Sequence, residues 1–210
     1  MNMSTKSERK ELTESLKQSL KPFGWKKSEY LFYRQVNRDT FVSSSGWDHS
    51  LDVTNKKFSI SAKIHNRTLN KISWNVYGID EDIDKPHMHV RSAFQCGLYF
   101  TQQSKEISYD GKIPCEIAQE MNDFIERYSL QYASIQRLDK QAPQDGKWFD
   151  AVNTLDALFC IKYAMGDIEA AKGYIEMEKR KPLFVQTPTA FVGRFLDRAE
   201  QCLKKQGCWL

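Results

Sequence analysis

Long apolar runs are missing from this chain of 210 residues. One of its longest apolar stretches, at 157–161, is far shorter than the ~20 residues that a membrane-spanning helix needs. The first ten residues are polar and charged, where a secretory signal would have its apolar segment. We therefore predict no membrane span and expect the protein in the cytoplasm.

Paired cysteines are missing as well. The 5 cysteines are an odd number and contain no Cys-x-x-Cys spacing. We expect reduced thiols. Cys160 and Cys202 fall at core positions of predicted helices, where a small buried thiol is chemically inert.

Signature motifs of the common enzyme classes are also missing. The sequence has no glycine-rich phosphate loop, no Gly-x-Ser-x-Gly elbow and no His-Glu-x-x-His helix. Kinases, serine hydrolases and metalloproteases that carry these motifs thus lose their usual support. We predict no catalytic residue and no cofactor, while an enzyme with an unmarked site stays open.

Charge is unevenly distributed along the chain. Residues 1–75 carry 14 Lys/Arg against 7 Asp/Glu, a net charge of +7, whereas the remainder carries 17 against 20, a net of −3. A basic front half of this kind is typical of a protein with an anionic partner. Ordinary decoration of a solvent-exposed surface by Lys and Arg is the alternative interpretation.

Apolar periodicity predicts a helix near the N-terminus. Leucines recur at every fourth position from 12 to 20 and form a stripe along one helix face. Thr5 followed by Glu8 resembles a capping box, and Pro22 with Gly24 should end the helix.

A sheet is predicted in the middle of the chain, where the apolar period changes to two. The change is clearest over 57–64, which is typical of a half-buried antiparallel strand. A turn is predicted at Asn55-Lys56. Further strands are expected at 30–36, 41–44, 72–77, 90–99 and 107–109.

The helical period returns in the last hundred residues. Helices are expected after Pro114, on both sides of a turn at Gly166-Asp167, and from Thr187, with a loop at 143–146. The helices around the turn should form a helical hairpin.

Strands and helices segregated in this order predict an α+β fold. It should have an N-terminal helix, an antiparallel sheet of four to six strands, and three or four C-terminal helices. We predict a single domain over 1–210, in which 1–112 supply the helix and sheet and the helices of 113–210 pack on them.

The densest polar segment is 80–89, Asp-Glu-Asp-Ile-Asp-Lys-Pro-His-Met-His. Its alternating aspartates have the spacing of a calcium loop, but lysine replaces the glycine of the sharp turn and arginine the final bidentate glutamate. His87 and His89 on one side of an extended segment, with Asp84, are a potential transition-metal site. A solvated hairpin loop is the alternative.

Aromatic and basic residues alternate in the front half and supply candidate contacts for a partner. Protein interfaces are rich in Trp, Tyr and Arg. The candidate binding residues are Trp25, Tyr30, Arg34, Trp47 and Trp74. The same mixture is typical of a nucleic-acid surface, and aromatic residues at a period of two are also typical of the core face of a sheet.

One stretch resembles a known family. Leu16-x3-Leu20-Lys21-Pro22-Phe23-Gly24-Trp25-Lys26-Lys27, followed by Phe32-Tyr33-Arg34, resembles the start of the bacterial DUF4304 family of uncharacterised proteins. The resemblance extends over roughly residues 10–110. It implies a bacterial origin and a small α+β protein of the kind that serves as an immunity or accessory partner, and it supplies no catalytic residues.

Three functions follow as hypotheses. We favour a non-enzymatic protein-interaction protein, for example a bacterial immunity protein that binds a toxin. The first alternative is a domain that binds nucleic acid or another polyanion through the basic front half. The second is a metal-dependent enzyme at the loop with His87 and His89.

Overall fold

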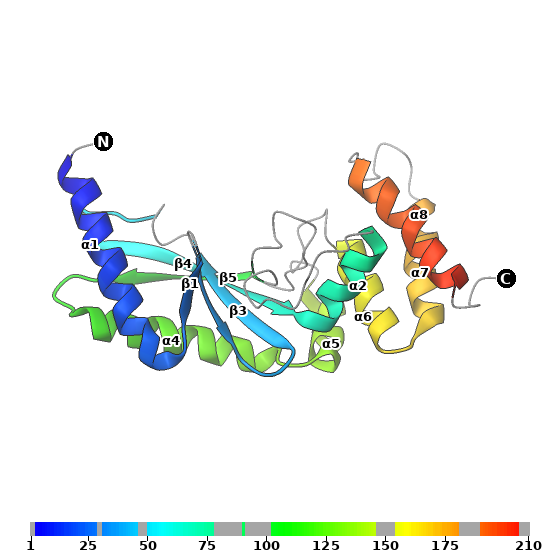
Figure 1. Ribbon diagram of the computed structural model, residues 1–210, viewed down its shortest axis with the longest axis horizontal. Helices are drawn as coiled ribbons and strands as arrows, with labels where there is room; N and C mark the ends of the chain where they lie inside the picture. The colour runs from blue at the N-terminus through cyan, green and yellow to red at the C-terminus, as the bar shows by residue number, and fades with distance from the viewer. Residues whose placement is uncertain are drawn as a thin grey trace. The chain divides into compact units, whose positions relative to one another are not determined.

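The structure is a computed structural model and describes residues 3–28, 31–45, 50–77, 90, 102–145, 154–180 and 190–205 (Figure 1). The chain divides into two compact units. Unit 1 comprises Met1–Ile64 and Thr101–Tyr132, and unit 2 comprises His65–Phe100 and Ala133–Leu210. The prediction of a single domain over 1–210, with the helix and sheet in 1–112 and helices in 113–210, stays a prediction. Part of the segment after residue 113, as far as Tyr132, belongs to the same unit as the sheet.

Unit 1 combines helices with a five-stranded sheet. In chain order its elements are α1 (Met3–Leu20), the 3-10 helix η1 (Lys21–Phe23), β1 (Lys26–Ser28), β2 (Leu31–Gln35), β3 (Thr40–Ser45), β4 (Lys57–Asn66), β5 (Gln102–Ser108) and α4 (Pro114–Gln131). The strands lie in the order β1-β2-β3-β4-β5, an antiparallel meander. The predicted α+β fold and its sheet are therefore confirmed.

Strand alternation buries one side of β4. Phe58, Ile60 and Ala62 are each at most 1% exposed, whereas the residues between them are half-buried. In the register with β5, Phe58 lies opposite the buried Ile107. α4 packs against both α1 and β5, so its apolar face helps to close the core of this unit.

The prediction for the start of α1 is wrong, and the prediction for its end is confirmed. The predicted capping box is wrong, because α1 begins before Thr5 and Glu8 instead forms an ion pair with Lys56. The predicted end is confirmed, because Pro22 lies in η1 and Gly24 follows with a φ of 79°. This left-handed conformation favours glycine, which has no Cβ.

Unit 2 is helical in its described part. Its elements are α2 (Arg67–Tyr77), α5 (Ile135–Asp145), α6 (Thr154–Ala164), α7 (Ile168–Lys179) and α8 (Ala190–Lys205). α2 packs against α6 and α8, while α6 also packs against α5 and α7. Phe159 and Phe195 are fully buried and meet edge to face, with ring centroids 5.5 Å apart.

One predicted strand is a helix. Apolar residues alternate at 72, 74 and 76, but this segment belongs to α2. The side-chain oxygen of Asn66 accepts a hydrogen bond from the N–H of Leu69 at 3.1 Å and caps the start of the helix. Leu69, Ser73 and Val76 are buried and have the spacing of one helix face. Because Ser73 is polar, the sequence does not show this face as an apolar pattern. The strand expected at 90–99 lies, apart from Val90, outside the described residues.

The predicted helical hairpin is confirmed by α6 and α7. Gly166, between them, has a φ of 76°, and the side chain of Asp167 accepts a hydrogen bond from the N–H of Ala170 at 3.2 Å. The loop expected at 143–146 is wrong over 143–145, which end α5. None of the helices that the structure describes has both the length and the apolar character needed to cross a membrane.

Candidate functional site

Two of the sequence-predicted binding residues, Trp25 and Arg34, come together in unit 1. Lys26 on β1 pairs with Tyr33 on β2, so one further step along the register places Trp25 beside Arg34. The Arg34 guanidinium lies over the Trp25 ring, 5.5 Å from its centroid, which is a cation–π arrangement.

Asn122 on α4 connects this pair to the helix. Its side-chain oxygen accepts a hydrogen bond from the Trp25 indole N–H at 3.1 Å and another from Arg34 at 3.0 Å. Its amide group donates to Glu126, one turn further along α4, at 3.3 Å. We call these four residues the Trp25 cluster. Asn122 is only 3% exposed, and buried polar groups that satisfy each other in this way specify one packing arrangement.

Burial changes the role expected of the tryptophans. Trp25 is 4% exposed in unit 1 and Trp74 is 3% exposed on α2 of unit 2. Neither side chain is exposed to solvent in this structure, and their role in binding a partner stays a prediction. Both side chains are core residues, which is the common use of aromatic side chains in a folded domain.

Tyr30 and Trp47, predicted as binding residues, lie outside the described residues. The same holds for Asp84, His87 and His89, the predicted metal ligands. Among the residues that the structure describes, no group of three or more His, Cys, Asp or Glu side chains is arranged to hold a metal ion.

Unit 1 has a hollow of about 610 Å³ where η1 meets α4. Its lining residues are Ser19, Pro22, Phe23, Cys115, Glu116, Gln119, Glu120, Asp123 and Arg127. Most of these side chains are exposed, while Phe23 is half-buried. We call it the η1–α4 hollow.

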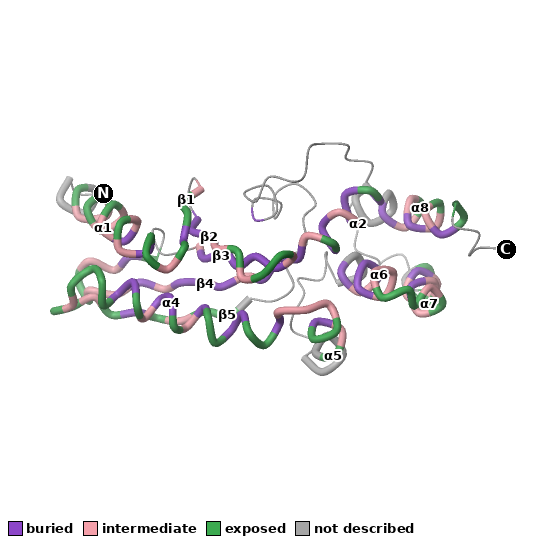
Figure 2. Tube along the Cα trace, turned by 60° about the horizontal axis from the view of Figure 1, so that its bottom comes forward, coloured by how far each residue is buried: buried purple, intermediate pink, exposed green. Residues whose placement is uncertain are grey.

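One exposed face of α4 forms a side of this hollow. Gln119, Asp123 and Arg127 recur every four residues, and Leu130 follows three residues later, so all four share a face. The Gln119 amide donates to the Asp123 carboxylate at 2.7 Å, and Arg127 Nε donates to the Asp123 carbonyl at 3.2 Å. Leu130 is 54% exposed, which places a large apolar side chain on the same face. Figure 2 shows buried and exposed segments alternating along α4.

The Trp25 cluster supports the hollow from within. Arg34 also donates a hydrogen bond to the backbone carbonyl of Phe23 at 3.5 Å, and the left-handed Gly24 turns the chain from η1 toward β1. These contacts hold Pro22 and Phe23 of η1 in place relative to α4. Sequence reasoning thus found two of the supporting residues, but assigned them to the surface.

Sequence reasoning missed the hollow and Asn122. One signal was available, because Asn122 is a polar residue directly after Met121 on the apolar side of a strongly periodic helix. The exposed residues of the hollow carried no signal of their own. Polar residues on the outer face of an amphipathic helix are expected in any fold.

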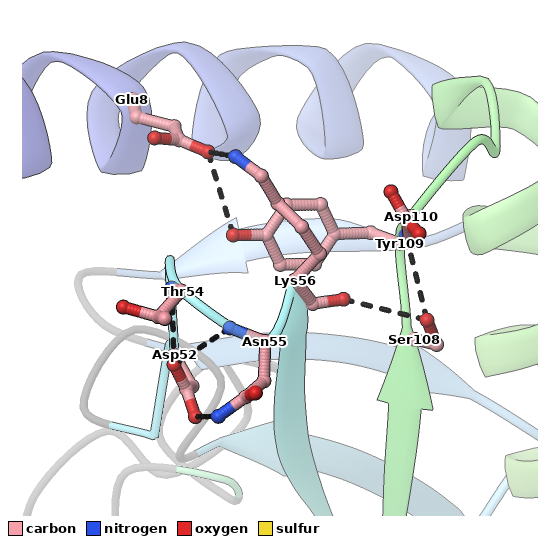
Figure 3. A network of polar contacts seen from close by, with 8 residues as sticks. All are labelled: Glu8, Asp52, Thr54, Asn55, Lys56, Ser108, Tyr109 and Asp110. Carbon is pink, nitrogen blue, oxygen red and sulfur yellow. Dashed lines mark hydrogen bonds and ion pairs between the residues drawn. The ribbon is translucent and has the colours of Figure 1, made fainter.

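A second polar cluster lies at the opposite end of α1 (Figure 3). The Glu8 carboxylate forms an ion pair with Lys56 Nζ and accepts its hydrogen bond at 2.6 Å. It accepts a second hydrogen bond from the Tyr109 hydroxyl at 3.5 Å. Lys56 Nζ also lies over the Tyr109 ring, 5.7 Å from its centroid. Helix α1, the turn before β4 and the end of β5 therefore meet at these three residues.

The turn that carries Lys56 has a defined geometry. The Asp52 carboxylate accepts hydrogen bonds from the backbone N–H groups of Thr54 and Asn55 at 3.1 and 3.0 Å. Asp52 and Lys57 exchange two backbone hydrogen bonds across the turn. Lys56 has a φ of 51°, the left-handed conformation that is uncommon outside glycine. The turn predicted at Asn55-Lys56 is therefore confirmed.

Electrostatics favour a structural role for this second cluster. The hydrogen bond to Glu8 raises the pKa of Lys56 above its usual 10.5. Burial, and then the Glu8 charge, raise the pKa of Tyr109 above its usual 10.0. Acid–base catalysts work best with a pKa near the operating pH, and both shifts move away from neutrality. The three residues act as a brace between α1 and the sheet.

Glu120, on the rim of the hollow, joins α4 to β5. Its carboxylate pairs with Lys105 at 2.8 Å and with Lys112 at 2.6 Å. The hydrogen bonds from Lys105 and then Lys112 lower the pKa of Glu120 below its usual 4.5. The carboxylate therefore contributes little net negative charge to the hollow.

Comparisons with protein families, curated proteins and solved structures found no match. The resemblance of residues 10–110 to the DUF4304 family stays a prediction.

Folding redistributes the charge of the basic front half. Unit 1 contains 15 Lys/Arg and 13 Asp/Glu, and unit 2 contains 16 and 14, so each unit has a net charge of +2. The excess of positive charge in the front half is offset because acidic residues of β5 and α4 fold into the same unit. The asymmetry of the sequence does not become an asymmetry between units.

Proposed function

We propose that this chain is a non-enzymatic protein-interaction protein and that the η1–α4 hollow is part of its contact surface. The observation that carries the proposal is the hollow itself. It combines an exposed proline and a half-buried phenylalanine with an exposed arginine, at Pro22, Phe23 and Arg127. Arg and aromatic residues are enriched at the centres of protein interfaces.

The support beneath the hollow strengthens the proposal. Trp25, Arg34 and Asn122 are linked by hydrogen bonds of about 3 Å, so the surface above them is held in one conformation. A contact surface that is rigid before binding loses less conformational entropy when its partner arrives. Leu130 continues the apolar part of the surface along α4.

The partner class follows from the chemistry of the surface. A hollow with apolar walls and both signs of charge suits a protruding side chain of another protein that is apolar or that combines apolar and charged parts. An immunity protein that occludes a toxin is one form of this role, because occlusion needs a contact surface and no catalysis. A specific interface buries roughly 800 Å² on each partner, so contacts would extend beyond the hollow itself.

The polyanion hypothesis receives less support from the structure. Each unit has a net charge of only +2, and Trp25, the aromatic residue next to Lys26 and Lys27, is buried where it cannot stack on a base. The metal-enzyme hypothesis depends on His87 and His89, which lie outside the described residues, and it stays a prediction.

A charge-reversal experiment tests the proposal. Arg127→Glu changes the hollow, whereas Lys204→Glu makes the same type of change at an exposed position on α8 of unit 2. Both variants and the wild-type chain are used to capture proteins from the cell that encodes them. We expect wild type and Lys204→Glu to recover the same stoichiometric protein and Arg127→Glu to lose it.

The captured protein is then purified and titrated against the three chains. A hot-spot arginine costs about 2 kcal/mol or more on removal, so the dissociation constant should rise at least tenfold in Arg127→Glu. Equal recovery by all three chains, or the absence of any stoichiometric protein, would contradict the proposal.

A further inference from the structure

The two edges of the sheet in unit 1 differ in how they face solvent. β1 has three residues, and two of them, Lys26 and Lys27, are exposed lysines. Short edge strands with lysines resist pairing with another chain. β5, at the other edge, has seven residues and contains no proline or glycine. β5 also carries a lysine, Lys105, but that side chain is ion-paired with Glu120 on α4. β5 is therefore the longer and less protected of the two edges.

The register identifies the backbone groups that β5 presents at its outer edge. The N–H of Tyr109 donates to the carbonyl of Lys56 at 2.8 Å, so these two residues form a hydrogen-bonded pair. Hydrogen-bonded and non-hydrogen-bonded pairs alternate along an antiparallel ladder. In the register of β4 with β5, Ile107, Lys105 and Gln103 therefore bond inward to β4.

The residues between them turn their main-chain groups away from β4. Ser104 and Glu106 thus direct their N–H and C=O groups to the outer edge, and both residues are exposed. Outside the β4–β5 ladder, the described part of the chain provides no backbone hydrogen-bond partner for either residue. The edge is therefore accessible and has its donors and acceptors available.

We infer that β5 pairs antiparallel with β5 of a second copy of this chain, so that the two sheets become continuous. Two-fold symmetry across an antiparallel pair places one residue opposite its own copy. A pair centred on Lys105 or on Glu106 would place like charges opposite each other, which is destabilising. A pair centred on Ser104 avoids this and places Gln103 opposite Lys105 of the second copy.

The register centred on Ser104 also matches the direction of the backbone groups. Ser104 faces its own copy, and Gln102 faces Glu106 of the second copy, so every residue with outward main-chain groups meets another. About six main-chain hydrogen bonds would form across the edge. A strand pair of this length buries less surface than a standard interface, so the association should depend on concentration. It uses β5 rather than the η1–α4 hollow and does not depend on the proposed function.

Proline at position 104 tests the pairing. Ser104→Pro removes only an outward N–H, and proline is tolerated on an edge strand at such positions. Ser104→Ala is the matched control, because it keeps the N–H. We expect sedimentation to show a concentration-dependent dimer for wild type and Ser104→Ala, and a monomer for Ser104→Pro with a circular dichroism spectrum like that of wild type.

Two charge variants test the register without altering the backbone. Gln103→Glu places a carboxylate opposite Lys105 of the second copy and should tighten the dimer several-fold, whereas Gln103→Lys should weaken it by a similar factor. Monomeric wild-type protein at every concentration, or equal dimerisation of all variants, would overturn the inference. A wild-type monomer whose Ser104→Pro variant loses a captured protein partner would also overturn it, because β5 would then pair with a foreign strand.

Discussion

Removing Asn122 is the sharpest test of how the candidate site is supported. Asn122→Leu keeps a side chain of similar size at a 3% exposed position but deletes the oxygen that Trp25 and Arg34 share. The buried indole N–H then lacks an acceptor, which costs about 1–3 kcal/mol. Arg34 is half-buried and its guanidinium can hydrogen-bond to water instead. Losing its hydrogen bond to Asn122 should therefore add no more than about 1 kcal/mol.

The new apolar side chain offsets part of this cost. Burying a leucine in place of an amide stabilises the fold by roughly 1 kcal/mol, so the expected net loss is about 0–3 kcal/mol of the free energy of unfolding. Urea denaturation measures the loss. Two probes should be compared, because a chain with two compact units need not unfold in one step. Gln131→Leu, at the exposed end of α4, is the control and should change the free energy by less than about 0.5 kcal/mol.

A double-mutant cycle isolates the hydrogen bond to Trp25. Trp25→Phe removes the indole N–H, so Asn122→Leu should cost about 1 kcal/mol less in that background than in wild type. An interaction energy near zero, with Asn122→Leu as stable as wild type, would refute the assignment of the Trp25 cluster as the support of the hollow.

Three further predictions follow from the other contacts. The pKa of Glu120 is lowered, so the stabilisation that this carboxylate provides is present above pH 4.5 and is lost as the pH falls through its folded pKa. Glu120→Gln should therefore reduce the loss of unfolding free energy on acidification by about 0.5 kcal/mol, whereas the control Glu11→Gln should leave that loss unchanged. The pKa values of Lys56 and Tyr109 are raised, so their stabilisation is lost as the pH rises above 10; Glu8→Gln should lower both pKa values in an NMR titration, and unchanged values would contradict the brace. In a chain with Cys96 and Cys208 replaced by serine, a thiol reagent followed by mass spectrometry should label the exposed Cys115 first and the buried Cys160 only on unfolding, with Cys202 slow because burial raises its pKa.

Local patterns predicted much of the fold. The fourfold leucine spacing before Pro22, the alternation at 57–64 and the turn at Gly166-Asp167 each correspond to an observed element. Such patterns are reliable because each element must bury one face, and the spacing of that face depends only on local backbone geometry. The segment at 72–77 was the exception, because three alternating apolar residues fit both periods and the cap at Asn66 lies outside the pattern.

The chain by itself determined α1, β4 and the helical hairpin of α6 and α7. It also determined that Trp25 and Arg34 are neighbours once β1 and β2 pair. Only the tertiary structure decided that these residues are buried and that Asn122, far along the sequence, joins them. It likewise decided that acidic residues of α4 and β5 offset the basic front half and that β5 occupies an edge. Exposure and charge at a surface depend on contacts between distant segments, and no local spacing of residues specifies those contacts.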